Sequence, residues 1–249
     1  MMVARLIGVV LAITLLAACS SQPHQVSGSG ETPAQINAKL GLQYMQQGNY
    51  DVSLEKLKRA LEQDPKLPAA HHYIAELYKN IKNYELADEH YRKAISLAPD
   101  DPAIQNNYGV FLCDRQRYND AEEHFLKAAR MKDYQSPDEA YQNAALCALR
   151  IPDKERARRY FREALAVNPL LAPALLQMSA LSLESGDYLQ ARGFLQRYEA
   201  IAPATAQSLW LGASIEHQLR NDTAVADYAR QLREQFPRAE ETARLRELE

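Results

Sequence analysis

The sequence of 249 residues is poor in glycine, with 9, and contains one tryptophan and 3 cysteines. So few glycines argue against a turn-rich all-β chain, whereas abundant alanine and leucine favour helix. The formal net charge is only −3, from 29 basic and 32 acidic side chains, so the composition gives no electrostatic reason to expect nucleic acid. A hydrophobic fraction of 47% nevertheless allows a folded core and excludes a chain that is disordered by composition.

Sequence signatures of catalysis and of cofactor binding are missing. There is no glycine-rich dinucleotide loop, phosphate-binding loop, serine nucleophile elbow, HExxH zinc motif or CxxC pair. The adjacent His71 and His72 would point about 100° apart on a helix, which makes joint metal coordination poor. We therefore expect a protein-binding protein with no catalytic residues, metal, cofactor, small-molecule substrate or nucleic-acid partner.

The first nineteen residues have the features of a lipoprotein signal peptide. Arg5 is followed by an apolar run over residues 6–18, which is shorter than the roughly 20 residues needed to cross a bilayer. The run ends in Leu-Ala-Ala before Cys19, which resembles a bacterial lipobox. The resemblance implies cleavage before Cys19 and its modification by a diacylglycerol and an N-acyl chain. The alternative is an ordinary signal peptide followed by a chance cysteine.

The residues after Cys19 indicate where the lipoprotein would reside. Under the sorting rule that the motif resembles, an Asp after the cysteine retains a lipoprotein in the inner membrane; Ser20 instead favours the periplasmic face of the outer membrane. Residues 20–33 are rich in Ser, Gly and Pro and lack apolar periodicity, which is typical of a flexible tether. The predicted segments are thus a signal peptide at 1–18 and a lipidated cysteine with its tether at 19–33.

A period of 34 residues runs through the rest of the chain. Prolines recur at 34-, 70-, 34- and 34-residue intervals, at Pro65, Pro99, Pro169, Pro203 and Pro237. Small residues keep the same step, at Gly41, Ala75, Gly109, Ala145, Ser179 and Ala213. This pattern is typical of the tetratricopeptide repeat, in which two antiparallel helices approach closely at small side chains and neighbouring units stack into one core.

The period predicts an all-α fold, a right-handed superhelical solenoid of six tetratricopeptide helix-turn-helix repeats. The predicted repeats are residues 34–67, 68–101, 102–135, 138–171, 172–205 and 206–239. Ser136 and Pro137 are an extra pair, and Asp133 replaces the proline of the third repeat, whose second helix is therefore expected to run on or to end differently. Residues 240–249 are expected to form a short polar cap, and we expect a monomer.

Two of the cysteines fall late in the first helices of consecutive repeats. Cys113 and Cys147 are 34 residues apart, and stacked first helices lie about 10 Å from each other, so facing side chains there can meet the geometry of a disulfide. An exported protein meets an oxidising compartment. Two interpretations stay open: a disulfide, or two buried free thiols that act as small apolar fillers.

The resemblance to tetratricopeptide repeats implies a concave groove lined by the first helices. The candidate groove residues are Leu42, Met45, His72, Glu76, Lys79, Asn80, Asn106, Val110, Asp114, Leu146 and Leu149. Later repeats offer Ala180, Leu183 and Trp210. Leu42 and Met45 are expected to be exposed apolar residues that capture an extended or helical segment of a partner. The alternative is that both pack against the preceding linker or a capping segment.

Taken together, the lipobox, the short tether, the six repeats and the NNYGVFLC stretch that ends at Cys113 resemble one family. It is the type IV pilus biogenesis lipoprotein of the PilF/PilW type, a secretin pilotin. The resemblance implies that the partner is a secretin subunit, which such proteins bring to the outer membrane and help to multimerise. The rival hypothesis is a lipid-anchored periplasmic scaffold for the assembly of outer-membrane β-barrels or cell-wall enzymes.

Replacing Cys19 with serine tests the anchor. We expect the wild-type chain in its native host to carry acyl mass and to fractionate with membranes, because two or more acyl chains hold a protein stably on a bilayer. The Cys19→Ser chain should lose both properties, whereas Cys113→Ser should keep them. Intact-mass spectrometry and membrane fractionation measure this, and a wild-type chain without acyl mass would reject the lipobox.

Overall fold

The computed structural model describes residues 30–151 and 153–248, and this part of the chain contains helices and no strand. The elements are α1 (Pro33–Gln46), α2 (Tyr50–Gln63), α3 (Pro68–Asn80), α4 (Tyr84–Leu97), α5 (Pro102–Asp114), α6 (Tyr118–Ala129), α7 (Pro137–Ala148), α8 (Lys154–Val167), α9 (Ala172–Glu184), α10 (Tyr188–Glu199), α11 (Ala206–Gln218), α12 (Asp222–Gln235), α13 (Glu240–Arg244) and the 3-10 turn η1 (Leu245–Glu247). The all-α class and the succession of helix-turn-helix repeats are confirmed. The signal peptide and Cys19 lie outside the described residues.

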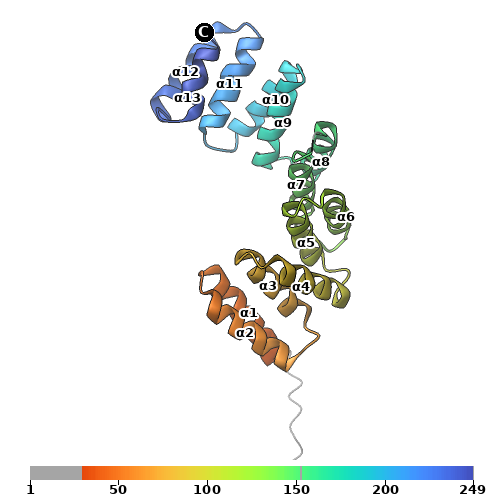
Figure 1. Ribbon diagram of the computed structural model, residues 1–249. Coiled ribbons are helices and arrows are strands. Elements are labelled where there is room, and N and C mark those ends of the chain that lie inside the picture. The colour runs from red at the N-terminus through yellow and green to blue at the C-terminus, as the bar shows by residue number, and fades with distance from the viewer. Residues whose placement is uncertain (1–29, 152, 249) are drawn as a thin grey trace, which may run out of the picture. The chain divides into compact units, whose positions relative to one another are not determined.

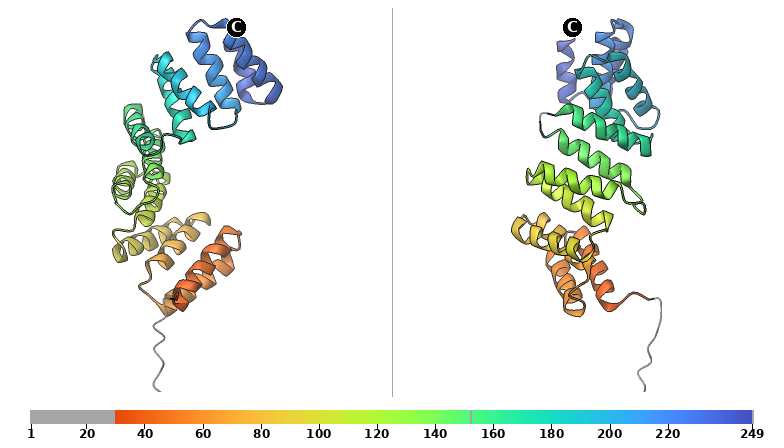
Figure 2. Two further views of the ribbon diagram at one scale, coloured as in Figure 1. Left: turned by 180° about the vertical axis from the view of Figure 1, so that it is seen from behind. Right: turned by 90° about the vertical axis from the view of Figure 1, so that its right-hand side faces the viewer.

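One pair of helices corresponds to each of the six expected windows, although α1 and α7 begin one residue before theirs. The pairs follow one another in chain order from α1–α2 to α11–α12 (Figures 1 and 2). After the last pair, α13 and η1 occupy the expected cap, where Leu245 is buried in a cluster with residues of α11 and α12. None of the helices in the described ranges has the length and apolar character needed to span a bilayer.

A proline follows the end of most of the second helices. Four prolines lie two residues beyond the last residue of a second helix: Pro65, Pro99, Pro169 and Pro237. The proline ring prevents a helix from continuing, and it is tolerated at this position because the helix has already ended. The third repeat has Asp133 instead, and α6 ends at Ala129 after 12 residues, two fewer than α4. The second helix of this repeat thus does not run on, and α10 ends at the equivalent residue although its repeat has Pro203.

The turn inside five of the pairs uses one left-handed residue at an equivalent position. Two are glycines, Gly48 and Gly186, with φ of 78° and 82°. The other three, Lys82, Gln116 and Arg220, take φ of 64°, 61° and 56° despite their Cβ atoms. A left-handed conformation costs a non-glycine residue roughly 1 kcal/mol or more, so these three turns are held by the helices that they connect.

Small residues let the two helices of a pair approach. A Cβ added at Gly109 on α5 would lie 2.7 Å from the ring of Phe125 on α6 and 3.2 Å from the carbonyl oxygen of Ala121. In the first pair, Gly41 leaves the corresponding space for Leu57, and the Ser53 hydroxyl donates to the Gly41 carbonyl at 2.7 Å. The glycines are therefore required by close packing, and the large residue opposite each of them is fully buried.

The carbonyl of the proline that ends a repeat is a recurring link to the following helices. Pro99 accepts from Gln105 Nε2 at 2.6 Å and from Lys127 Nζ at 2.7 Å. The Pro169 carbonyl accepts from Arg197 at 2.9 Å. Because proline interrupts the helix, its carbonyl has no intrahelical partner, and side chains of the next pair satisfy it.

A histidine makes the same link between the first and second pairs. The Nε2 of His71 lies 3.2 Å from the Pro65 carbonyl oxygen, and its Nδ1 lies 3.1 Å from Nδ1 of His90. Gln105 takes the equivalent place in the third repeat, where its Oε1 lies 2.6 Å from Nδ1 of His124. Burial lowers the pKa of His71, His90 and His124, so the folded chain favours the neutral rings.

These lowered pKa values predict that the fold loses stability in mild acid. The unfolded histidines bind protons near pH 6.5, whereas the folded ones resist protonation, so stability is complete above about pH 6.5 and declines as the pH falls below it. His71→Gln reproduces the arrangement of Gln105 with one titrating group fewer. We expect the urea midpoint of this variant to fall less between pH 7.5 and pH 5 than that of the wild type. Equal losses in the two chains would contradict the assignment.

Candidate functional site

Three of the expected groove residues come together on the facing first helices of the third and fourth pairs. Val110 and Asp114 of α5 and Leu146 of α7 line a cavity of about 100 Å³. Leu146 is 40% exposed, whereas Val110 is half-buried. The cavity is thus an apolar depression with an accessible leucine at its edge, with space for about one aliphatic side chain.

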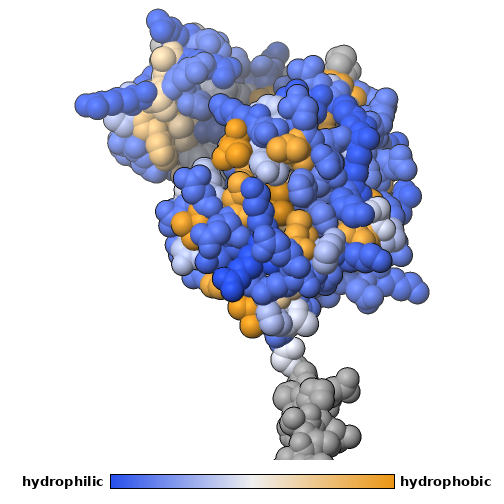
Figure 3. All heavy atoms as spheres, turned by 60° about the horizontal axis from the view of Figure 1, so that its bottom comes forward, coloured by the Kyte–Doolittle hydropathy of each residue, from blue (hydrophilic) through white to orange (hydrophobic). Residues whose placement is uncertain are grey.

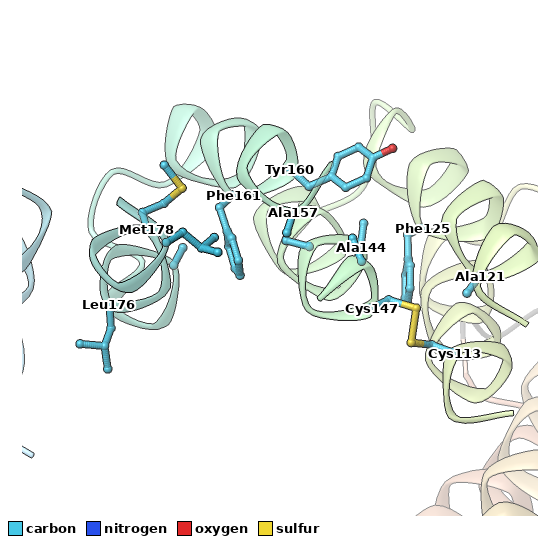
Figure 4. Close-up of a cluster of buried hydrophobic side chains, with 14 of the residues drawn as sticks. Cys113, Ala121, Phe125, Ala144, Cys147, Ala157, Tyr160, Phe161, Leu176 and Met178 are labelled. Atoms are coloured by element: carbon cyan, nitrogen blue, oxygen red, sulfur yellow. A yellow bond between two sulfur atoms is a disulfide. The ribbon is translucent and has the colours of Figure 1, made fainter. Parts of the chain in front are cut away.

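A disulfide lies in the wall of this cavity. Cys113 of α5 and Cys147 of α7 are bonded, with their Cα atoms 5.9 Å apart. Figure 4 shows the bond between the two helices, with the Phe125 side chain of α6 beside it. The disulfide links the third pair covalently to the fourth and fixes the spacing of the two helices that carry Val110 and Leu146.

Polar groups surround the apolar cavity. Arg150 Nη1 lies 2.8 Å from Asp114 Oδ1, and both side chains are about half exposed. Nδ2 of Asn143 donates to Oδ1 of Asn106 at 3.1 Å. An exposed ion pair contributes little stability, so Asp114 and Arg150 can exchange partners at small cost. The cavity therefore has an apolar floor and a charged rim, as a site for a peptide side chain requires.

Two of the expected groove residues of α3, Glu76 and Lys79, bond to each other. Glu76 accepts from Lys79 Nζ at 2.6 Å and from the buried hydroxyl of Tyr91. Burial, with the nearby Glu76 carboxylate as a second cause, raises the pKa of Tyr91, so the phenol keeps its proton and donates. Asn80 is exposed at the end of α3. This network gives α3 a polar surface.

Several groove predictions were wrong about exposure. Met45 is buried, and Leu42 is half-buried against the same cluster, which includes Leu57 and Ile74. The reason is that α1 contacts α3 as well as α2, so its expected groove face is covered by the next pair. Met45 packs among residues of the first two pairs. Residues 20–29 of the linker lie outside the described residues, so the alternative of packing against the linker stays a prediction.

His72, Asn106 and Leu149 are also largely withdrawn from solvent. Nε2 of His72 lies 2.9 Å from Nδ2 of Asn107 on α5, and burial lowers the pKa of His72. Asn106 is buried and Leu149 packs against the main core. These three side chains join neighbouring repeats, and they do not line the cavity between α5 and α7.

A second depression lies farther along the first helices. Ala180 and Leu183 of α9, Trp210 of α11 and Arg244 of α13 line a cavity of about 360 Å³. The Arg244 guanidinium carbon lies 4.4 Å from the centre of the Trp210 ring. The sequence indicated Trp210 as a groove residue but gave no signal that the C-terminal cap supplies a wall of the site.

Apolar side chains gather in groups within a largely hydrophilic surface on the face shown in Figure 3. This distribution suits recognition by separate anchor cavities. Across the described ranges no group of three or more His, Cys, Asp or Glu side chains is arranged to hold a metal ion. His71 and His72 point to different partners, Pro65 and Asn107, as their adjacent places on a helix imply.

Comparison with known proteins identifies tetratricopeptide repeats in this chain and finds similar proteins of type IV pilus biogenesis. Models of the tetratricopeptide repeat match residues 41–82, 68–101 and 112–170. The chain is 28% identical to the type IV pilus assembly protein PilF of Pseudomonas aeruginosa over 199 residues, which are 80% of this chain and 79% of that protein.

The solved structures extend the similarity over nearly the whole folded part. A structure of Pseudomonas aeruginosa PilF superposes with a TM-score of 0.78 at 28% identity, over 87% of this chain and 98% of that one. The crystal structure of PilW, described as a widely conserved type IV pilus biogenesis factor, gives a TM-score of 0.73 at 30% identity, over 86% of this chain and 98% of that one.

Removing the disulfide should weaken the array at the candidate site. A loop of 34 residues closed by a disulfide corresponds to about 3–4 kcal/mol in the chain-entropy model. We expect Cys113→Ser/Cys147→Ser to lower the free energy of unfolding by about this amount, measured by urea denaturation, and the oxidised wild type to contain neither thiol in free form. Two titratable thiols, in addition to any at Cys19, in the denatured unreduced chain would exclude the bond.

Proposed function

Because this chain belongs to the PilF/PilW family of tetratricopeptide-repeat pilus-biogenesis proteins, we propose that it is an outer-membrane lipoprotein that binds a secretin subunit in its groove. Binding would serve to deliver the subunit to the outer membrane and to promote its multimerisation during type IV pilus biogenesis. The observation that carries the proposal is the cavity between α5 and α7, where an exposed leucine, an apolar floor and a charged rim lie on facing first helices.

The chemistry of this cavity favours one kind of contact. Its volume of about 100 Å³ suits a single aliphatic side chain inserted between Val110 and Leu146. The partner's neighbouring polar groups can then bond to Asp114, Arg150 or Asn143 on the rim. An apolar anchor with polar neighbours is how an extended or helical segment docks in a groove without a large apolar surface.

The membrane anchor would act together with the groove. An acylated Cys19 and a short tether would keep the groove near the inner leaflet of the outer membrane, which raises the effective concentration of captured subunits at the place of assembly. No covalent chemistry on the partner is needed in this mechanism. Recognition of the subunit by the groove, attachment to the outer membrane and the raised local concentration account for assembly. In this proposal the protein is not an enzyme.

The scaffold hypothesis for β-barrels or cell-wall enzymes makes a different prediction at the level of the cell. Deletion of the pilus-biogenesis protein should remove secretin multimers and piliation while porin levels stay normal. Loss of porins with normal secretin multimers would instead favour the scaffold. Immunoblots of heat-resistant secretin multimers and of porins in the same membranes distinguish the two hypotheses.

Charge introduced at Leu146 tests the groove directly. We expect Leu146→Glu to weaken binding of the purified secretin subunit at least tenfold, because the partner's apolar anchor would meet a carboxylate without a compensating bond. Leu189→Glu is the matched control, since Leu189 is 71% exposed and lies on α10, a second helix. Both variants should keep the wild-type melting temperature, and surface plasmon resonance measures the affinities. Unchanged binding by Leu146→Glu would exclude this cavity.

A further inference from the structure

The junction between the fifth and sixth pairs departs from the repeat at one position. Glu199, the last residue of α10, has apolar equivalents in the preceding repeats, Leu61, Ile95, Ala129 and Leu165. All four of these side chains are partly or fully buried, and each belongs to or packs against an apolar cluster. The Glu199 side chain is exposed and accepts from the Tyr228 hydroxyl, so a carboxylate open to solvent stands where the array otherwise places apolar packing.

The same junction lacks a cation that other junctions have. In the third and fifth repeats, Lys127 and Arg197 donate to the carbonyl of the preceding repeat's proline, Pro99 or Pro169. The residue equivalent to them is Glu163 in the fourth repeat and the uncharged Gln231 in the sixth. At the last junction the Pro203 carbonyl accepts from the Tyr198 hydroxyl at 3.2 Å.

The fifth repeat shows how an arginine fills this place. The guanidinium carbon of Arg197 lies 5.7 Å from the centre of the Phe194 ring while its Nη2 donates to Pro169. The residue equivalent to Phe194 in the sixth repeat is Tyr228. The last junction therefore retains an aromatic ring, whereas the position equivalent to Arg197 has no cation.

A cavity occupies the corresponding space. It has a volume of about 430 Å³ and is bounded by Glu199, Asp227, Tyr228 and Gln231, with an apolar floor of Ala202, Ala204, Leu209 and Ala224. The Tyr228 hydroxyl donates to Glu199 Oε1 at 2.9 Å, which leaves Oε2 as an acceptor. The Oδ1 atom of Asp227, another residue that lines the cavity, lies 3.5 Å from Nη2 of Arg230.

We propose that this cavity binds an arginine side chain of a partner protein. The guanidinium takes the place that Arg197 takes one repeat earlier, over the ring of Tyr228, and donates to the carboxylates of Glu199 and Asp227. Planar guanidinium combines ring stacking with directed donors, which the compact ammonium of lysine does not. The site is formed by α10, α11, α12 and the loop before α11, and it shares no residue with the cavity between α5 and α7.

The test uses the full-length chain, labelled with ¹⁵N, and N-acetylarginine methylamide as the probe. We expect saturable shifts of the amide signals of residues 199–204 and 224–231. N-acetylcitrulline methylamide has nearly the same shape without the charge and should bind at least tenfold more weakly. Equal binding of the two compounds, or no saturable shift with the arginine probe, would overturn the proposal without the need for any variant.

Three substitutions, one of them a control, test the location of the site. Gln231→Arg supplies the missing cation from within the chain and should abolish probe binding, whereas Gln235→Arg, one turn farther on α12 and outside the cavity, should leave it unchanged. Glu199→Gln should weaken binding at least tenfold. Wild-type affinity in a folded Gln231→Arg chain would contradict the proposal. Because secretin binding is assigned to Leu146, the two results are independent.

Discussion

Each helix pair of this chain has an apolar face that only the next pair can cover, and the rest of the structure depends on this constraint. One cluster of buried side chains runs from Ala75 in the second pair to Ile215 in the sixth, and Tyr78 packs against both this cluster and that of the first pair. The core therefore extends along the array of helix pairs, and each repeat is stabilised by its neighbours. At the end of the array the last pair is covered by Leu245 of the cap.

The 34-residue period was sufficient to predict the fold, because the residues that stacking requires recur at this interval. Small residues mark the close approach of two helices, and prolines mark the ends of the second helices. The period could not predict the solvent exposure of individual groove residues, since their exposure depends on how each helix pair packs against the next. Met45 shows this: it has the register of a groove residue, but the contact between α1 and α3 buries it.

The candidate site followed from sequence only where two signals coincided. Val110, Asp114 and Leu146 were in the groove register, and the adjacent cysteines fixed which helices face each other. The wall that α13 adds beside Trp210 had no such signal, because a short polar C-terminal segment gives no periodicity. Glu199 and Gln231 were not predicted, because their role depends on the cavity that they share.

The disulfide also has a mechanical consequence. When such an array is stretched from its two ends, helix pairs peel away and each unravelled residue adds up to about 3.5 Å of length. The 34-residue segment between Cys113 and Cys147 cannot lengthen in this way, so about 110 Å of extension is withheld while the bond is intact. The end-to-end length of the middle of the array is thus limited by the disulfide, and the helix pairs on either side of it unfold first under tension.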